Sequence, residues 1–126
     1  LSIKKTSNDI VVSCSHNGYK RLQGKPIHHR CWKMSKYKLQ IEDDVNGNLS
    51  AISKYILHPT VQCFQIDKHQ FELKMPNGKI AHFISEVGEI SVVKAVYYPE
   101  FGRKVDTQAL IVKLIQGKAI SFLSWN

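Results

Sequence analysis

Hydrophobic and polar residues alternate along most of this chain, which is the pattern of half-buried β-strands. In residues 37–42, for example, Tyr37, Leu39 and Ile41 share one face of an extended strand and the residues between them share the other. No segment keeps a helical period of 3.6 residues over three turns with capping residues at both ends. The pattern therefore predicts an all-β protein.

Turn signals divide the chain into short extended runs at the spacing of an antiparallel protein. The expected strands are 9–15, 30–34, 37–42, 51–57, 61–66, 71–75, 80–85, 89–98, 107–115 and 119–125. Asn77-Gly78 predicts a type I′ hairpin, and Gln116-Gly117-Lys118 predicts a second hairpin. We expect one domain over residues 1–126, an antiparallel two-sheet β-sandwich of about ten strands, with a closed barrel as the competing architecture.

The composition agrees with one globular domain, because the chain has 126 residues of which 43% are hydrophobic. Its apolar stretches are far shorter than the roughly 20 residues that span a bilayer, so no transmembrane segment is expected. There is no charged and then apolar leader. The first residue is Leu1 rather than Met, which predicts a piece of a longer protein.

The net charge of +8 is concentrated near the N-terminus. The first 40 residues hold nine basic side chains and one acidic side chain, whereas basic and acidic residues balance in the remainder. A one-sided positive field attracts anionic partners such as acidic polysaccharide, anionic lipid or nucleic acid. A solvated basic face without a specific ligand is the alternative.

Cysteine and histidine spacing indicates neither a disulfide scaffold nor a metal site. Cys14, Cys31 and Cys63 are odd in number and form no CxxC pair, so we interpret them as core residues. Cys14 and His16 share a strand face, but no recognised ligand spacing accompanies them. We therefore expect no metal bound by this chain.

A histidine-rich and basic group is the best candidate for a ligand site. It consists of His16, Tyr19, His28, His29 and Arg30. If the strands on either side of residues 17–27 pair as a hairpin, these side chains meet near its end, where they could bind a carboxylate or sulfate. The alternative is that His16 and Tyr19 only hydrogen-bond the loop's own backbone.

Adjacent carboxylates occur at Asp43-Asp44, at the end of an expected strand. Such a pair could act in acid–base catalysis or hold calcium. We interpret it instead as capping a turn or offsetting nearby lysines.

The order of short motifs resembles the C-terminal region of heparinase II/III-like proteins. The motifs are SHNGYKRL, IHHRCW, KLQIEDDVNG, YILHP and the ending VYYPEFG followed by two apolar strands. Phe101 stands where the family usually has Tyr, and the likeness extends over nearly the whole chain from about Asp9.

This resemblance implies a β-sandwich that follows an α/α-toroid domain in a polysaccharide lyase, which cleaves uronate-containing glycans by β-elimination. The family's catalytic Asn, His and Tyr, and its zinc ligands, lie upstream of this region. No residue here matches them, so the chain alone is expected to be inactive and to hold no cofactor, with any zinc belonging to the parent protein. The expected partners are the toroid domain of the same chain and an acidic polysaccharide, in a bacterial periplasm or cytoplasm.

Two other functions fit the residues. The chain could be a stand-alone carbohydrate- or polyanion-binding module in which Tyr97, Tyr98 or Trp32 stacks on sugars. It could also be a nucleic-acid-binding barrel, which the basic N-terminal third would suit but which we do not favour.

Overall fold

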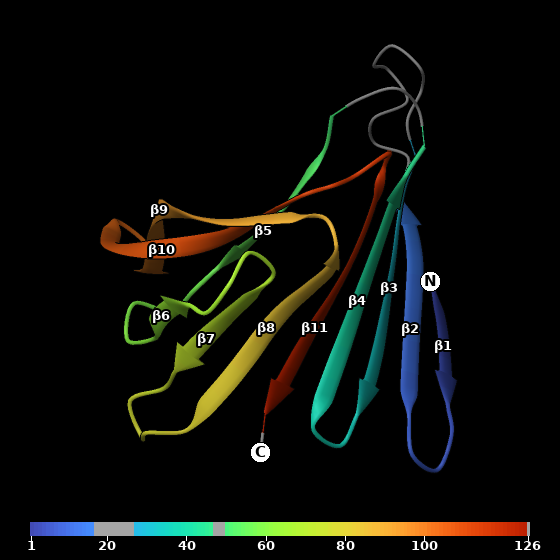
Figure 1. Ribbon diagram of the computed structural model, residues 1–126, viewed down its shortest axis with the longest axis horizontal. Coiled ribbons are helices and arrows are strands. Elements are labelled where there is room, and N and C mark those ends of the chain that lie inside the picture. The colour runs from blue at the N-terminus through green and yellow to red at the C-terminus, as the bar shows by residue number, and fades with distance from the viewer. Residues whose placement is uncertain (17–26, 47–49, 126) are drawn as a thin grey trace.

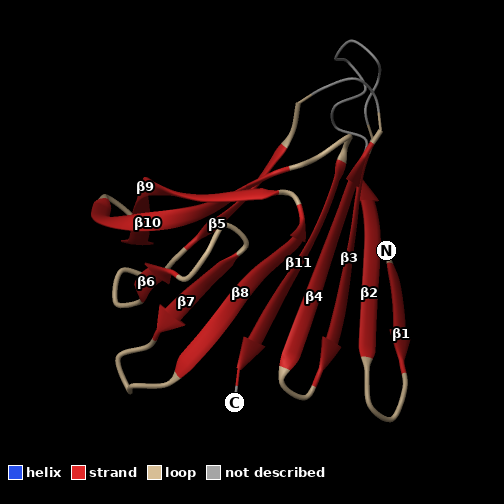
Figure 2. Ribbon diagram, in the orientation of Figure 1, coloured by secondary structure: helices blue, strands red, loops and turns tan. Residues whose placement is uncertain are grey.

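The computed structural model describes residues 1–16, 27–46 and 50–125, and within them every regular element is a β-strand (Figure 2). In chain order the strands are β1 (Ser2–Lys5), β2 (Ile10–His16), β3 (His28–Ser35), β4 (Lys38–Val45), β5 (Ile52–Ile56), β6 (Gln62–Gln65), β7 (Gln70–Lys74), β8 (Ile80–Val87), β9 (Glu89–Glu100), β10 (Arg103–Lys113) and β11 (Lys118–Trp125). The expected all-β class is confirmed, and β1 is a strand that the alternation did not predict.

The strands form two antiparallel sheets. The large sheet has the order β1-β2-β3-β4-β11-β8-β7-β6 and the small sheet has the order β5-β10-β9. Figure 1 shows the small sheet over the β6–β8 part of the large sheet, while β1, β2 and β3 extend beyond it. The two-sheet sandwich is therefore confirmed, although its layers differ greatly in width.

The hydrophobic core lies between the small sheet and the part of the large sheet that it covers. Leu110 and Val112 of β10 are completely buried against Phe71, Leu73 and other side chains of the large sheet. The described members of this core come from β4 to β11 and their connections, and none comes from β1, β2 or β3. The first three strands thus carry their inner face past the edge of the core.

The chain passes between the sheets at two glycine corners. Gly88 joins β8 to β9 with a φ of +118°, and a Cβ atom there would lie 2.7 Å from Cγ1 of Val112. Gly117 precedes β11, and a Cβ atom on it would lie 2.3 Å from the carbonyl oxygen of Val45. Both positions need glycine because the backbone passes too close to its neighbour for a side chain.

Two of the predicted hairpins differ from the expectation. At Asn77-Gly78 the amide of Gly78 donates to the carbonyl of Met75 and Gly78 alone has a positive φ, so Pro76 starts a type I turn rather than a type I′ turn. Gln116 and Gly117 do have positive φ values, which fits type I′. The strands that flank them separate into different sheets after one bridge, Ile115 to Lys118, so that hairpin prediction was wrong beyond the turn.

Candidate functional site

The strongest polar cluster lies where the small sheet meets β3 and β4, and its centre is the buried carboxylate of Asp43. Arg30 donates to it twice, from Nε to Oδ1 at 2.5 Å and from Nη2 to Oδ2 at 3.0 Å. Nε2 of His28 lies 2.8 Å from Oδ1, and the hydroxyl of Ser53 on β5 donates to Oδ2 at 2.7 Å. The four bonds join β3, β4 and β5 and thereby link the two sheets.

The electrostatics of this cluster favour the charged forms of Asp43 and Arg30. Burial alone would raise the pKa of Asp43, but the hydrogen bonds from Arg30, His28 and Ser53 outweigh it and hold that pKa below its usual value. Burial would lower the pKa of Arg30, and Asp43 more than compensates by raising it. Burial raises the pKa of Tyr55 to about 12. The cluster is therefore an ion pair whose hydrogen-bonding positions are already used internally.

Aromatic rings enclose the guanidinium of Arg30. Its Cζ atom lies 5.7 Å from the ring centre of Trp32 on β3 and 5.7 Å from that of Tyr55 on β5. Tyr55 in turn packs against Phe83 on β8, with the ring centres 5.3 Å apart. This stack continues the contact between the sheets into the apolar core.

The structure brings some of the predicted ligand residues together and separates others. His16 lies directly opposite His28 across β2 and β3, so the expected hairpin is confirmed, and Arg30 shares their face of the sheet. His29 lies on the opposite face, where its Nδ1 is 2.7 Å from the hydroxyl of Ser15. Tyr19 lies outside the described residues. His28 and Arg30 both contact the carboxylate of Asp43.

Asp43 is the central residue that the sequence interpretation missed. The interpretation of it as a turn cap was wrong, because its side chain is only 1% exposed and belongs to the ion pair. Strand alternation could have identified it, since Asp43 continues the inward face of Leu39 and Ile41. A carboxylate on an inward face needs a cationic partner, and Arg30 is directly opposite it.

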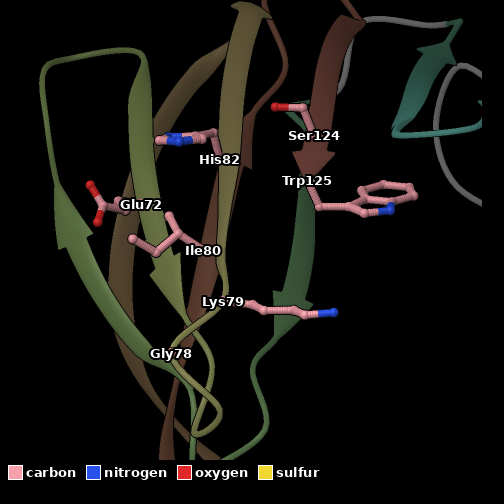
Figure 3. A pocket seen from close by; sticks show the side chains of 7 residues that line it. All are labelled: Glu72, Gly78, Lys79, Ile80, His82, Ser124 and Trp125. Atoms are coloured by element: carbon pink, nitrogen blue, oxygen red, sulfur yellow. The ribbon is translucent and has the colours of Figure 1, made fainter.

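A second group of polar side chains lines a shallow pocket on the outer face of the large sheet. Glu72, His82 and Ser124 are direct neighbours across β7, β8 and β11, and Figure 3 shows them extending to one side, away from Trp125. The pocket has a volume of about 390 Å³. Gln70 donates to Nδ1 of His82 at 3.1 Å in the tautomer that protonates Nε2. Within the described residues no hydrogen bond joins His82 to Glu72 or Ser124.

The other candidate residues are dispersed. Tyr98 is exposed, whereas Tyr97 packs edge-on against His58 and Trp32 lies beneath Arg30. The three cysteines are unpaired and half-buried, and of these Cys63 packs against the core as predicted. Among the residues that the structure describes, no three His, Cys, Asp or Glu side chains gather as metal ligands would.

The sequence of this chain matches a known protein family. The sequence model of the family "Heparinase II/III-like, C-terminal" matches residues 2–122. The chain belongs to this family. A search of curated protein sequences found no significant match.

Solved structures share the fold of this heparinase II/III-like domain at low sequence identity. Heparan sulfate lyase HepC from Pedobacter heparinus superposes with a TM-score of 0.78 at 12% identity. A structure described as a heparinase III gene product superposes with a TM-score of 0.78 at 11% identity. The matches cover 98% and 99% of this chain, respectively, and 21% of each of those chains. The heparinase II/III-like domain therefore spans about one fifth of these structures.

The described part of the heparinase II/III-like domain has no helix that is long and apolar enough to cross a membrane.

Proposed function

We propose that this chain is the supporting C-terminal β-domain of a polysaccharide lyase that acts on acidic, uronate-containing glycans by β-elimination. The observation that carries this proposal is the family match over residues 2–122. The small share of two larger lyase structures that the fold occupies also supports it. In this proposal the partner is an N-terminal α/α-toroid domain of the same polypeptide.

The reaction requires groups that the described residues of this chain do not bring together. β-Elimination needs a base for the C5 proton, positive charge beside the uronate carboxylate, and an acid for the leaving O4 atom. The most perturbed carboxylate, Asp43, already accepts hydrogen bonds from Arg30, His28 and Ser53. We therefore assign the chemistry to the preceding domain, and a structural role to the Asp43 cluster.

The edge around His16 is proposed as a border of the glycan cleft. His28 and Arg30 support this edge through Asp43. His16, Tyr19 and His29 are the other predicted ligand residues, and they are the side chains to test for glycan contact. The excess of basic residues in the first 40 positions would attract an acidic polymer to this side of the domain.

An assay for unsaturated uronate product tests the proposal. The full parent chain should release this product from at least one acidic glycan, such as heparan sulfate or alginate, whereas the 126-residue chain should release none. Turnover by the 126-residue chain would overturn the supporting role. A folded parent chain that is inactive on a full panel of acidic glycans would overturn the assignment to a lyase.

A stand-alone carbohydrate-binding module is the second candidate, because the outer pocket presents polar groups from three strands. Titration calorimetry with neutral and acidic oligosaccharides, and with single-stranded DNA, at two salt concentrations would test it. A module should keep its glycan affinity at the higher salt and lose it in His82→Ala, with Gln40→Ala on the same face as control. Equal binding of all polyanions that falls steeply with salt would indicate only a basic surface.

A further inference from the structure

The inner face of the large sheet continues past the core as an apolar surface over which the described chain places no second sheet. We call it the open face, and its members are Ile3, Ile10, Val12, Trp32, Met34 and Leu39. They are cross-strand neighbours on β1 to β4, and Leu39 is itself opposite Leu123 of the core region. The open face is thus the same sheet surface as the core, without a second layer over it.

Three of these side chains are exposed, and the other three, Val12, Trp32 and Leu39, are half-buried. Ile3 is 63% exposed, Ile10 is 39% exposed and Met34 is 45% exposed. Ile10, Val12, Trp32, Met34 and Leu39 border a shallow hollow of about 390 Å³. Single exposed apolar residues are ordinary, but a contiguous patch that continues a core indicates an interaction surface.

The charges beside the open face restrict the chemistry of its partner. On β1 to β3 the basic residues Lys5 and Arg30 share the side of the open face, whereas Lys4 and Lys33 lie across from Val11 on the other side of the sheet. These three strands contain no acidic residue. Arg30 is neutralised by Asp43, whereas Lys5 lies opposite Ile10 at the edge of the open face. A complementary surface would be apolar and would carry an acidic group where it meets Lys5.

We propose that the open face docks the polypeptide segment that immediately precedes β1 in the parent lyase, through an apolar surface with an acidic group that faces Lys5. This inference rests on the proposed function, because it takes the chain as one part of a longer protein. The lyase structures that share the fold extend far beyond it, since the fold covers only 21% of each. Figure 1 places the N-terminus beside β1, at the border of the open face, so a preceding segment would emerge next to this surface.

Connection through β1 favours this occupant over a second copy of the chain. A tethered segment meets the open face at a high effective concentration, whereas a second copy must find it by diffusion. The alternative occupant is tested by the oligomeric state of the 126-residue chain.

The test compares two isoleucines of equal exposure. Ile10 on the open face is 39% exposed and Ile80 on the outer face is 40% exposed. The polypeptide encoded upstream in the same reading frame is produced separately and titrated against wild-type chain, Ile10→Lys and Ile80→Lys, with circular dichroism to confirm that each is folded. Wild type and Ile80→Lys should bind alike, and Ile10→Lys should bind at least tenfold more weakly. Ile3→Lys on the edge strand is the second open-face variant.

Three outcomes would overturn the docking proposal. The first is that Ile10→Lys and Ile80→Lys bind the upstream polypeptide with equal affinity. The second is that the wild-type chain does not bind it and that hydrogen exchange of β1–β3 is the same in the full parent chain as in the 126-residue chain. The third is a wild-type homodimer that Ile10→Lys dissociates. The lyase assay is independent of these readouts. A parent chain that docks but has no activity would contradict the proposed function and leave the docking surface in place.

Discussion

Replacing Asp43 by Asn should destabilise the domain while preserving the volume of the side chain. Asp43 accepts four hydrogen bonds, two from Arg30 and one each from His28 and Ser53. An amide offers one oxygen atom in place of two and turns its NH₂ group toward donors. The substitution therefore removes two of the four bonds and the negative charge that Arg30 requires.

The size of the loss follows from the burial of the partners. A hydrogen bond to a charged group contributes about 1.5–3 kcal/mol, and the lower end applies here because Arg30 and His28 are 24% and 27% exposed, so water replaces part of each lost bond. We expect Asp43→Asn to lower the free energy of unfolding by about 3 kcal/mol, a large part of the roughly 5–15 kcal/mol typical of a domain.

The assay is urea unfolding followed by tryptophan fluorescence, with Asp44→Asn as the matched control. Asp44 lies on the other face of β4 and makes no side-chain hydrogen bond within the described residues, so its substitution should change stability by less than about 0.5 kcal/mol. A loss for Asp43→Asn no larger than that of the control would refute the view that this cluster joins the sheets.

The pH dependence supplies a second readout of the same cluster. Because the pKa of Asp43 is lowered in the folded state, its stabilisation is present above about pH 4 and decreases as the pH falls through the folded-state pKa. The stability difference between wild type and Asp43→Asn should therefore narrow in acid. A difference that stays constant with pH would contradict the charge-based explanation.

Three further results are expected. Gly88→Ala should lower the free energy of unfolding in urea by about 3 kcal/mol, because the added Cβ atom would meet Val112 at a position where φ is +118°. Gly78→Ala adds a Cβ atom with nothing within 4 Å and should lower it by about 1 kcal/mol, so equal losses would contradict the close approach at Gly88. Leu110→Ala should lower stability by about 2–5 kcal/mol through a core cavity, and a loss below about 1 kcal/mol in thermal unfolding would place the core elsewhere. Ultraviolet titration of the wild type, compared with Tyr55→Phe, should show Tyr55 ionising near pH 12 because burial raises its pKa. Its contribution to stability is therefore present below about pH 10 and is lost toward pH 12, and ionisation near pH 10 would contradict its burial.

Local sequence signals predicted the strands better than the turns between them. Alternation placed the strand that contains Leu39 and Ile41, and the Gln116-Gly117 pair did form a turn with two positive φ values. At Asn77-Gly78 the preceding Pro76 changed the turn type, because proline fixes a negative φ at the second turn position. Dipeptide signals thus located the turns, and neighbouring residues decided their geometry.

The candidate site was predicted only where it depends on strand pairing. The pairing of His16 with His28 follows from two adjacent strands, and the order of the motifs by itself indicated the family. Alternation and pairing could also have placed Asp43 opposite Arg30, but the contacts from Ser53 and Tyr55 could not be predicted, because these residues reach the cluster from a strand of the other sheet. The separation of His29 from Arg30 follows from alternation alone, because consecutive residues of a strand point to opposite faces of the sheet. The predicted ligand group nevertheless contained both residues.

The sequence by itself determined the all-β class, most strand positions and the family, because alternation and motif order are properties of residues close together along the chain. The tertiary structure decided which strands share a sheet, which carboxylate is buried and which apolar side chains stay uncovered. These outcomes depend on the unequal width of the two layers, since a three-stranded sheet cannot cover an eight-stranded one. The apolar residues of β1 to β3 have the pattern of a core face, and only the position of the small sheet shows that nothing in the described chain lies over them.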